Sequence, residues 1–337
     1  MTKQATIKDI ARLAGVAPST VSRVVTNSPG VGAQTRMRIW KLIEEHNYRP
    51  NSVARSLVTQ RLRTIGILVP LKRGKAFFEN PFFADVLMGA SEAAAQRNYD
   101  VLLYTASREQ TNVLQERKVD GVLAVGLRED DRLLPHLKNQ DMRVVFINRE
   151  IDDQSLTWVS VDNRQGACKA VLELIRLGHR RIGFIGGPNE MRSGKLRRQG
   201  YLDALGERGI DICPDLLTEG NFDEESGLEC ALKLLSLRPR PTAIFAANDL
   251  MAIGALKAAK TLKIKVPNEL SLCGFDNIHS CLHTDPPLST VKMPAFKMGQ
   301  LACQMMLALL SGGEPEARQI LLPTELVRRE SMGKIGG

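Results

Sequence analysis

The apolar positions of the first 48 residues recur at helical spacing and predict three short helices. The first begins after Thr6 and ends at Gly15, the second spans residues 18–25 and the third spans residues 33–46. A tight turn that contains glycine joins the first two. Two short helices joined in this way are typical of a helix-turn-helix.

The second of these helices has one apolar face and one face of small polar groups. Val21 and Val24 share a side and are expected to pack inward. Hydroxyl groups can approach phosphates and base edges closely, and arginine is the usual bidentate reader of guanine. The sequence therefore predicts that a DNA-reading face is formed by Ser19, Thr20, Ser22 and Arg23.

From residue 64 onward the pattern changes to short apolar strands that alternate with amphipathic helices. Strands are predicted at 64–70, 100–106, 120–126, 143–149, 158–162, 181–187, 242–249 and 271–277. Helices are predicted at 83–97, 131–140, 164–178, 195–208, 224–236, 249–262 and 296–311. This alternation favours an α/β fold with two parallel sheets that helices cover on both faces. Ligands bind such sheets at the carboxyl ends of the strands.

The positive charge of the chain is concentrated at its N-terminal end. Residues 1–64 hold eleven Lys or Arg against three Asp or Glu, which gives +8 of the total net charge of +9. A small basic head on a nearly neutral body is the electrostatic footprint of a protein that binds a polyanion. A solvated charged face would explain the charge alone, so the interpretation depends on charge and motif together.

The composition is that of a soluble chain with two or three folded domains: 337 residues, 43% hydrophobic and 25% charged. The start, MTKQATIKDIARLAG, has no apolar signal-peptide core, and no apolar run is long enough to span a membrane. The six cysteines are far apart and form no CxxC motif. Reduced thiols and a cytoplasmic location are therefore expected.

The stretches TIKDIARLAGVAPSTVSRVV and YRPNSVARSL closely resemble the head of the lac-repressor (LacI/GalR) family of bacterial regulators. Ala17 replaces the usual capping serine, Pro18 and Ser19 occupy variable reading positions, and Thr26 stands where asparagine is common. The operator sequence therefore does not transfer from a relative. The resemblance implies DNA contacts at Pro18, Ser19, Thr20, Ser22, Arg23, Asn51, Ala54, Arg55 and Leu57.

Later segments resemble the periplasmic-binding-protein-like sensor of the same family: LGHRRIGFIGGP, RRQGY, FAANDLMAIGAL, LCGFDN and DPPLSTV. The resemblance implies an N-terminal helix-turn-helix three-helix head plus hinge helix, and then a two-lobed sensor with parallel sheets. Residues 107–119 are fewer than is usual in the family, which predicts a truncated helix there. The implied domains are 1–48 for DNA binding, 49–63 for the hinge helix and linker, and 64–331 for effector binding and dimerisation. The implied lobes are 64–160 with 292–320, and 163–290 with the C-terminal end.

The segment RPNSVARSL, residues 49–57, predicts a helix that is too short to be stable alone. Asn51 is a good N-cap, but nucleation costs more than one or two turns return. In a dimer on DNA, two copies can pair through Val53 and Ala54 and enter the minor groove. The resemblance places Leu57 where an apolar wedge kinks the central base step. The hinge is therefore predicted to fold only on DNA, and so to couple lobe orientation to operator affinity.

Four of the ten phenylalanines lie within residues 77–83, directly after the first predicted strand. In such folds this loop faces the cleft between the lobes, where aromatic faces stack on sugar rings. FFENPFF in this place looks like maltose- and α-glucoside-responsive members of the family, whereas a buried hydrophobic corner is the structural alternative. The resemblance implies effector contacts at Asn80, Phe82, Arg149, Arg197, Asn248 and Asp276.

The motifs of common enzymes are absent from the sequence. It contains no GxGxxG, Walker A, GxSxG or HExxH, although GFIGGP superficially suggests a nucleotide loop. We therefore expect no catalytic residues, no enzyme activity and no cofactor. The run from His279 to His283 places His and Cys close together, but no second pair of ligands lies nearby, so no metal is predicted.

Together these patterns predict a sequence-specific DNA-binding transcriptional regulator, a repressor whose affinity for a palindromic operator is set by a small-molecule effector. A sugar of glucoside or maltose type is expected. The alternatives are a family member that senses a phosphoprotein partner, and a non-regulatory sugar-binding protein or sugar-active enzyme. The residues after Ser331 form no heptad for a helical bundle, so a homodimer is expected, with no membrane partner.

Overall fold

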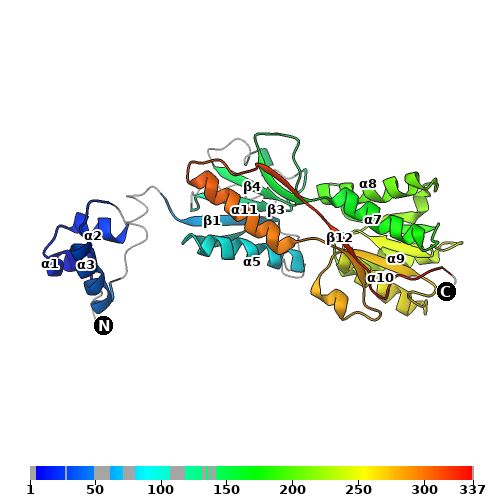
Figure 1. The fold of residues 1–337 in the computed structure, drawn as a ribbon. Coiled ribbons are helices and arrows are strands. Elements are labelled where there is room, and N and C mark those ends of the chain that lie inside the picture. The colour runs from blue at the N-terminus through cyan, green and yellow to red at the C-terminus, as the bar shows by residue number, and fades with distance from the viewer. Residues whose placement is uncertain are drawn as a thin grey trace. The chain divides into compact units, whose positions relative to one another are not determined.

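The computed structural model describes residues 5–26, 29–48, 61–70, 80–106, 118–130, 134, 135, 137 and 142–335. The chain forms two compact units, Met1–Arg63 and Thr64–Gly337, which are described separately (Figure 1). The hinge predictions lie outside the described residues, and they concern Asn51, Ala54, Arg55 and Leu57.

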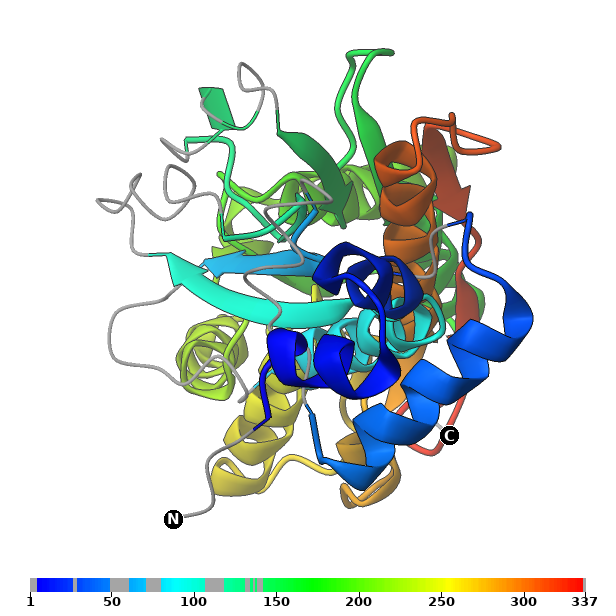
Figure 2. The same cartoon turned by 90° about the vertical axis from the view of Figure 1, so that its left-hand side faces the viewer.

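The first unit is a three-helix head, which confirms the fold predicted for it. It consists of α1 (Ile7–Ala14), α2 (Pro18–Val25) and α3 (Ala33–Glu45), which pack together (Figures 1 and 2). Thr6 and Asp9 form a capping box at the start of α1. Gly15 ends α1 in the left-handed conformation at φ 62°. The buried centre is formed by Ile10, Val21, Val24, Ile39 and Ile43.

The second unit contains two sheets, each of six strands among the described residues. In the first, the order is β11-β5-β4-β3-β1-β2 and every pair is parallel. In the second, the order is β12-β10-β9-β8-β6-β7 and only β12 is antiparallel to its neighbour. These sheets confirm the predicted α/β class.

The strands of the first sheet are β1 (Thr64–Pro70), β2 (Asp100–Ala106), β3 (Gly121–Val125), β4 (Arg143–Ile147), β5 (Thr157–Val161) and β11 (Gln319–Leu322). Those of the second sheet are β6 (Ile182–Gly186), β7 (Leu217–Glu219), β8 (Ala243–Ala246), β9 (Ser271–Asp276), β10 (Ser289–Lys292) and β12 (Glu325–Val327). The sequence patterns missed β7, β10, β11 and β12, because three or four residues of mixed polarity carry little periodicity.

The long helices pack in pairs beside the sheets (Figure 1). The first lobe contains the first sheet and the second lobe contains the second sheet. In the first lobe, α5 (Pro81–Ala95) packs against α11 (Ala295–Leu310). In the second lobe, one pair is α7 (Asn163–Arg176) with α8 (Arg192–Glu207), and the other is α9 (Glu224–Ser236) with α10 (Asp249–Thr261). The short helices are η3 (Pro214–Leu216) and η4 (His279–Leu282).

Within the described part of the chain, the backbone passes between the two lobes three times: from β5 to α7, from β10 to α11, and from β11 to β12. The last passage is the red strand that runs between the sheets in Figure 1. Since α11 belongs to the first lobe but follows β10 of the second lobe along the chain, each lobe is built from segments far apart in the sequence.

Two glycines allow α5 and α11 to approach each other closely. A methyl group at Gly89 of α5 would collide with the carbonyl oxygen of Phe296, and one at Gly299 of α11 would collide with that of Val86. Both obstacles are backbone atoms, which cannot rotate away. The distance between these helices is therefore set by the absence of a side chain.

We predict that Gly299→Ala destabilises the protein by about 1–3 kcal/mol, the usual cost of overpacking a close contact. The matched control is Gly206→Ala in α8, where nothing lies within 4 Å of an added methyl group. That change should stabilise the helix by about 0.5–1 kcal/mol. Urea unfolding of the variants measures both effects, and equal stabilities of the two variants would contradict the prediction.

Candidate functional site

The side chain of Arg197 on α8 stands at the centre of the second lobe and is only 3% exposed. Its Nε donates to Asn163 Oδ1 at 2.9 Å, and its Nη1 donates to the Ala247 carbonyl at 2.5 Å and to Asp276 Oδ1 at 3.2 Å. The guanidinium carbon lies 3.7 Å from the ring centroid of Phe275. Asp276 and Ala247 end or follow parallel strands, where ligands of α/β folds bind.

The Asp276 carboxylate is the second charge of this centre. Burial raises the pKa of Asp276, and the neighbouring Arg197 opposes that rise. Burial likewise lowers the pKa of Arg197. Asp276 has φ 117° and Asn277 has φ 62°, values that residues other than glycine rarely adopt. Such backbone strain persists only where the surroundings enforce it, and it is concentrated at functional sites.

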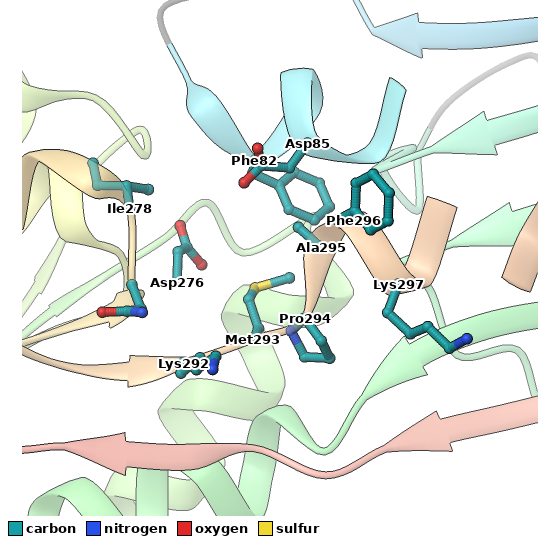
Figure 3. A pocket seen from close by; sticks show the side chains of 11 residues that line it. Phe82, Asp85, Asp276, Ile278, Lys292, Met293, Pro294, Ala295, Phe296 and Lys297 are labelled. Carbon is teal, nitrogen blue, oxygen red and sulfur yellow. The ribbon is translucent and has the colours of Figure 1, made fainter. Parts of the chain in front are cut away.

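A cavity of about 310 Å³ lies beside Asp276 and is lined from both lobes (Figure 3). Phe82 and Asp85 reach it from α5, and Asp276 and Met293 face them from the strand ends. The volume is near the lower limit of small-molecule sites, which is about 300 Å³. Burial raises the pKa of Asp85. The remaining lining residues are Asn277, Ile278, Lys292, Pro294, Ala295, Phe296 and Lys297.

The structure gives the six predicted effector contacts different surroundings. Phe82 and Asp276 line the cavity, and Arg197 binds Asp276 directly. Asn80 caps α5 through the Phe82 amide at 3.1 Å, and Asn248 caps α10 through the Met251 amide and donates to the Phe222 carbonyl. Arg149 is half-buried and donates to the Leu127 carbonyl at 2.7 Å. Their contact with an effector remains a prediction.

The prediction from sequence missed Asn163, which connects Arg197 to the first lobe. Its Oδ1 accepts the bond from Arg197, and its Nδ2 donates to Asn148 Oδ1 at 3.5 Å. Asn163 comes two residues after the end of β5 and opens α7, and ligands of α/β folds bind at the carboxyl ends of strands. This position between a predicted strand and a predicted helix is the signal by which the sequence could have identified Asn163.

Four charged residues also join the lobes, and we call them the inter-lobe clasp: Arg128, Glu129, Glu190 and Lys195. Arg128 Nη2 lies 2.6 Å from Glu190 Oε2, and Lys195 Nζ lies 2.5 Å from Glu129 Oε2. The Glu129 amide also donates to the Glu190 carbonyl at 2.8 Å. Arg128 and Glu129 follow β3 of the first lobe, whereas the other two flank the start of α8.

The head presents the predicted reading residues on one side of α2. Val21 and Val24 are fully buried, as expected. Pro18, Ser19 and Arg23 are exposed, and Thr20 and Ser22 are half-buried. Ala17 provides no side-chain cap, so α2 begins with proline in its first turn instead.

None of the helices formed by the described residues is long and apolar enough to cross a membrane. Among the same residues, no group of three or more His, Cys, Asp or Glu is arranged to hold a metal ion.

Two family models match the sequence of this chain. The model for bacterial regulatory proteins of the lacI family matches residues 6–51, and that for a periplasmic binding protein-like domain matches residues 171–332. A similar curated protein is the probable HTH-type transcriptional repressor ExuR of Bacillus subtilis, 35% identical, with 98% of this chain and 99% of that protein covered. The HTH-type transcriptional regulator CelR of Thermobifida fusca is 33% identical, with 98% of each chain covered.

Solved structures agree with these matches. A complex of the transcriptional regulator CelR with cellobiose has a TM-score of 0.76 at 32% identity, covering 97% of this chain and 99% of that one. The lac repressor dimer bound to operator and the anti-inducer ONPF has a TM-score of 0.86 at 26% identity, covering 98% and 100%.

We predict that the clasp couples the two lobes through a weak ion pair. In a double-mutant cycle of Glu129→Ala and Lys195→Ala, the free energy of unfolding should show a coupling of about 0.2–1 kcal/mol that fades in molar salt. The control cycle combines Lys195→Ala with Glu224→Ala, since Glu224 pairs with Lys257 instead. Additive effects in the first cycle, as expected in the control, would refute the coupling.

Proposed function

Because this chain belongs to the lacI family of bacterial regulatory proteins, we propose that it acts as a homodimeric repressor on a palindromic operator. We further propose that a sugar bound between its lobes sets its affinity for that operator.

The outer face of α2 is the observation that carries the DNA-binding part of the proposal. Exposed Ser19 and Arg23 lie on the side of α2 opposite the buried Val21 and Val24, in a head that holds nearly all of the net positive charge. Small hydroxyl side chains allow the helix to enter the major groove, and the Arg23 guanidinium can form two parallel hydrogen bonds with a guanine edge. A two-fold dimer presents two such helices, and a palindromic site matches that symmetry.

The centre formed by Arg197, Asp276 and Asn163 supports a polyhydroxylated effector. Arg197 holds the Asp276 carboxylate in place, and Asp276, Asn277 and the Phe82 ring line the cavity. Sugar hydroxyls need both donors and acceptors, and the apolar face of a sugar ring packs on aromatic rings. The likeness to a CelR–cellobiose complex supports a sugar, and the FFENPFF segment favours a glucoside or maltose type.

The hinge is the proposed link between DNA binding by the head and effector binding by the lobes. Asn51 to Leu57 would form a helix only on DNA, with Leu57 as the wedge in the minor groove. A sugar that binds one orientation of the lobes more tightly would then shift the hinge between its ordered and disordered forms.

Two experiments test the proposal as a whole. Selection of duplexes from random DNA by the full chain should enrich one two-fold symmetric sequence, and the absence of such a sequence would refute operator binding. A thermal-shift screen against mono- and disaccharides should then find a stabilising sugar, and that sugar should change the affinity for the selected duplex. If only a phosphoprotein, and no sugar, changes the affinity for the duplex, the proposal of a sugar effector is refuted.

We predict that Asp276→Asn weakens effector binding by about 10- to 100-fold, since a hydrogen bond to a charged group contributes about 1.5–3 kcal/mol. Operator affinity without effector should remain unchanged. Asp276→Asn is preferable to Arg197→Ala, because the asparagine keeps the size of the side chain and an oxygen that accepts from Arg197, whereas the alanine would remove every donor that holds the buried carboxylate. Calorimetry measures the effect, with Asp215→Asn at an exposed position as the control. Equal affinity in both variants would contradict the assignment.

We predict that Arg23→Ala costs about 1–3 kcal/mol of discrimination at one base pair of the selected operator, the usual worth of a bidentate contact. Fluorescence anisotropy on operators with single substitutions measures this loss. Lys41→Ala on α3 is the control, and it should not change the preference at that base pair. If Arg23→Ala weakens binding to every sequence equally, Arg23 contacts phosphate and does not read a base.

A further inference from the structure

Two imidazoles lie side by side on the exposed turn η4, outside the sites described above. His279 opens the turn and His283 follows its last residue. Their Nε2 atoms are 3.2 Å apart, and the ring centroids are 4.9 Å apart at an interplanar angle of 68°. Both side chains are exposed, so solutes reach both nitrogens directly.

The separation of these nitrogens suits a chelated metal ion. Tetrahedral zinc binds imidazole nitrogens at about 2.0–2.1 Å, which places two of them about 3.3 Å apart. The observed 3.2 Å differs little from that distance. An N–H···N hydrogen bond between the rings is the competing explanation, but 3.2 Å is at the long end of such bonds.

The backbone beneath the pair is already fixed, so chelation would order only two side chains. The Cys281 amide donates to the Ile278 carbonyl at 3.0 Å, and the Leu288 amide donates to the Cys281 carbonyl at 2.9 Å. The Ile278 amide is held by the buried Asp249 carboxylate at 2.9 Å. A rigid support of this kind preorganises a ligand pair.

The chemistry of the turn selects the class of ion. Imidazole nitrogens prefer zinc, copper and nickel to magnesium or calcium. Cys281 does not join them, because its side chain is fully buried. Since no third His, Cys, Asp or Glu of the described residues completes the set, water would fill the remaining positions. An open site of two ligands exchanges its ion, unlike a closed structural site.

The sequence pattern predicts no metal at this run, but the geometry of the two imidazoles supports one. We propose that His279 and His283 form an exchangeable binding site for a divalent transition-metal ion of the zinc class. Neither histidine lines the cavity beside Asp276.

Calorimetric titration of the untagged full chain with zinc chloride, after removal of metals by dialysis against a chelator, tests the proposal. Zinc should bind the wild type, and His279→Gln and His283→Gln should each weaken the affinity by about tenfold or more. His46→Gln is the matched control, because His46 is exposed and is the only histidine in residues 1–63 of the sequence. It should bind zinc like the wild type.

A second measurement separates binding from damage to the fold. Zinc should raise the melting temperature of the wild type and of His46→Gln, but not that of the His279→Gln/His283→Gln double variant. All variants should melt alike without zinc, since both side chains are exposed. A wild type that binds no zinc, or single variants that bind it as tightly as the wild type, would overturn the proposal.

Discussion

The buried cation of Arg197 is the constraint on which the centre of the second unit depends. A guanidinium removed from water is tolerated only where an opposite charge and acceptors meet its donors. The end of β9 supplies Asp276, the start of α7 supplies Asn163, and the residue after β8 supplies a carbonyl. One side chain of α8 therefore fixes how these elements converge, and the polar centre is organised before a ligand arrives.

The cavity beside this centre is lined from both lobes. Phe82 and Asp85 belong to the first lobe and Asp276 to the second, so a molecule that fills the cavity would contact both. A ligand shifts an equilibrium between two arrangements of the lobes only by its differential affinity for them. The inter-lobe clasp is partly exposed and therefore weak. It can bias the lobes toward each other without preventing a ligand from changing their orientation.

Packing between α5 and α11 helps to set where the walls of the cavity stand. The helix α5 carries Phe82 and Asp85, and α11 follows the segment that contains Met293. These helices meet through Gly89 and Gly299, where a single methyl group would collide with backbone. One residue of this close contact, Phe296, also lines the cavity, so the helix contact and the cavity wall depend on each other.

The sequence by itself determined the features that depend on neighbours along the chain. Helical spacing of apolar residues, the capping box of Thr6 and Asp9, and the runs that form β1 to β6 all act over a few residues. Only the tertiary structure decided the pairing of Arg197 with Asn163, the bond from Asn248 to the Phe222 carbonyl, and the short strands β7 and β12. These contacts join residues whose separation along the chain leaves no periodic trace. They form because parallel strands bring their carboxyl ends to one edge and because buried polar groups must find partners there.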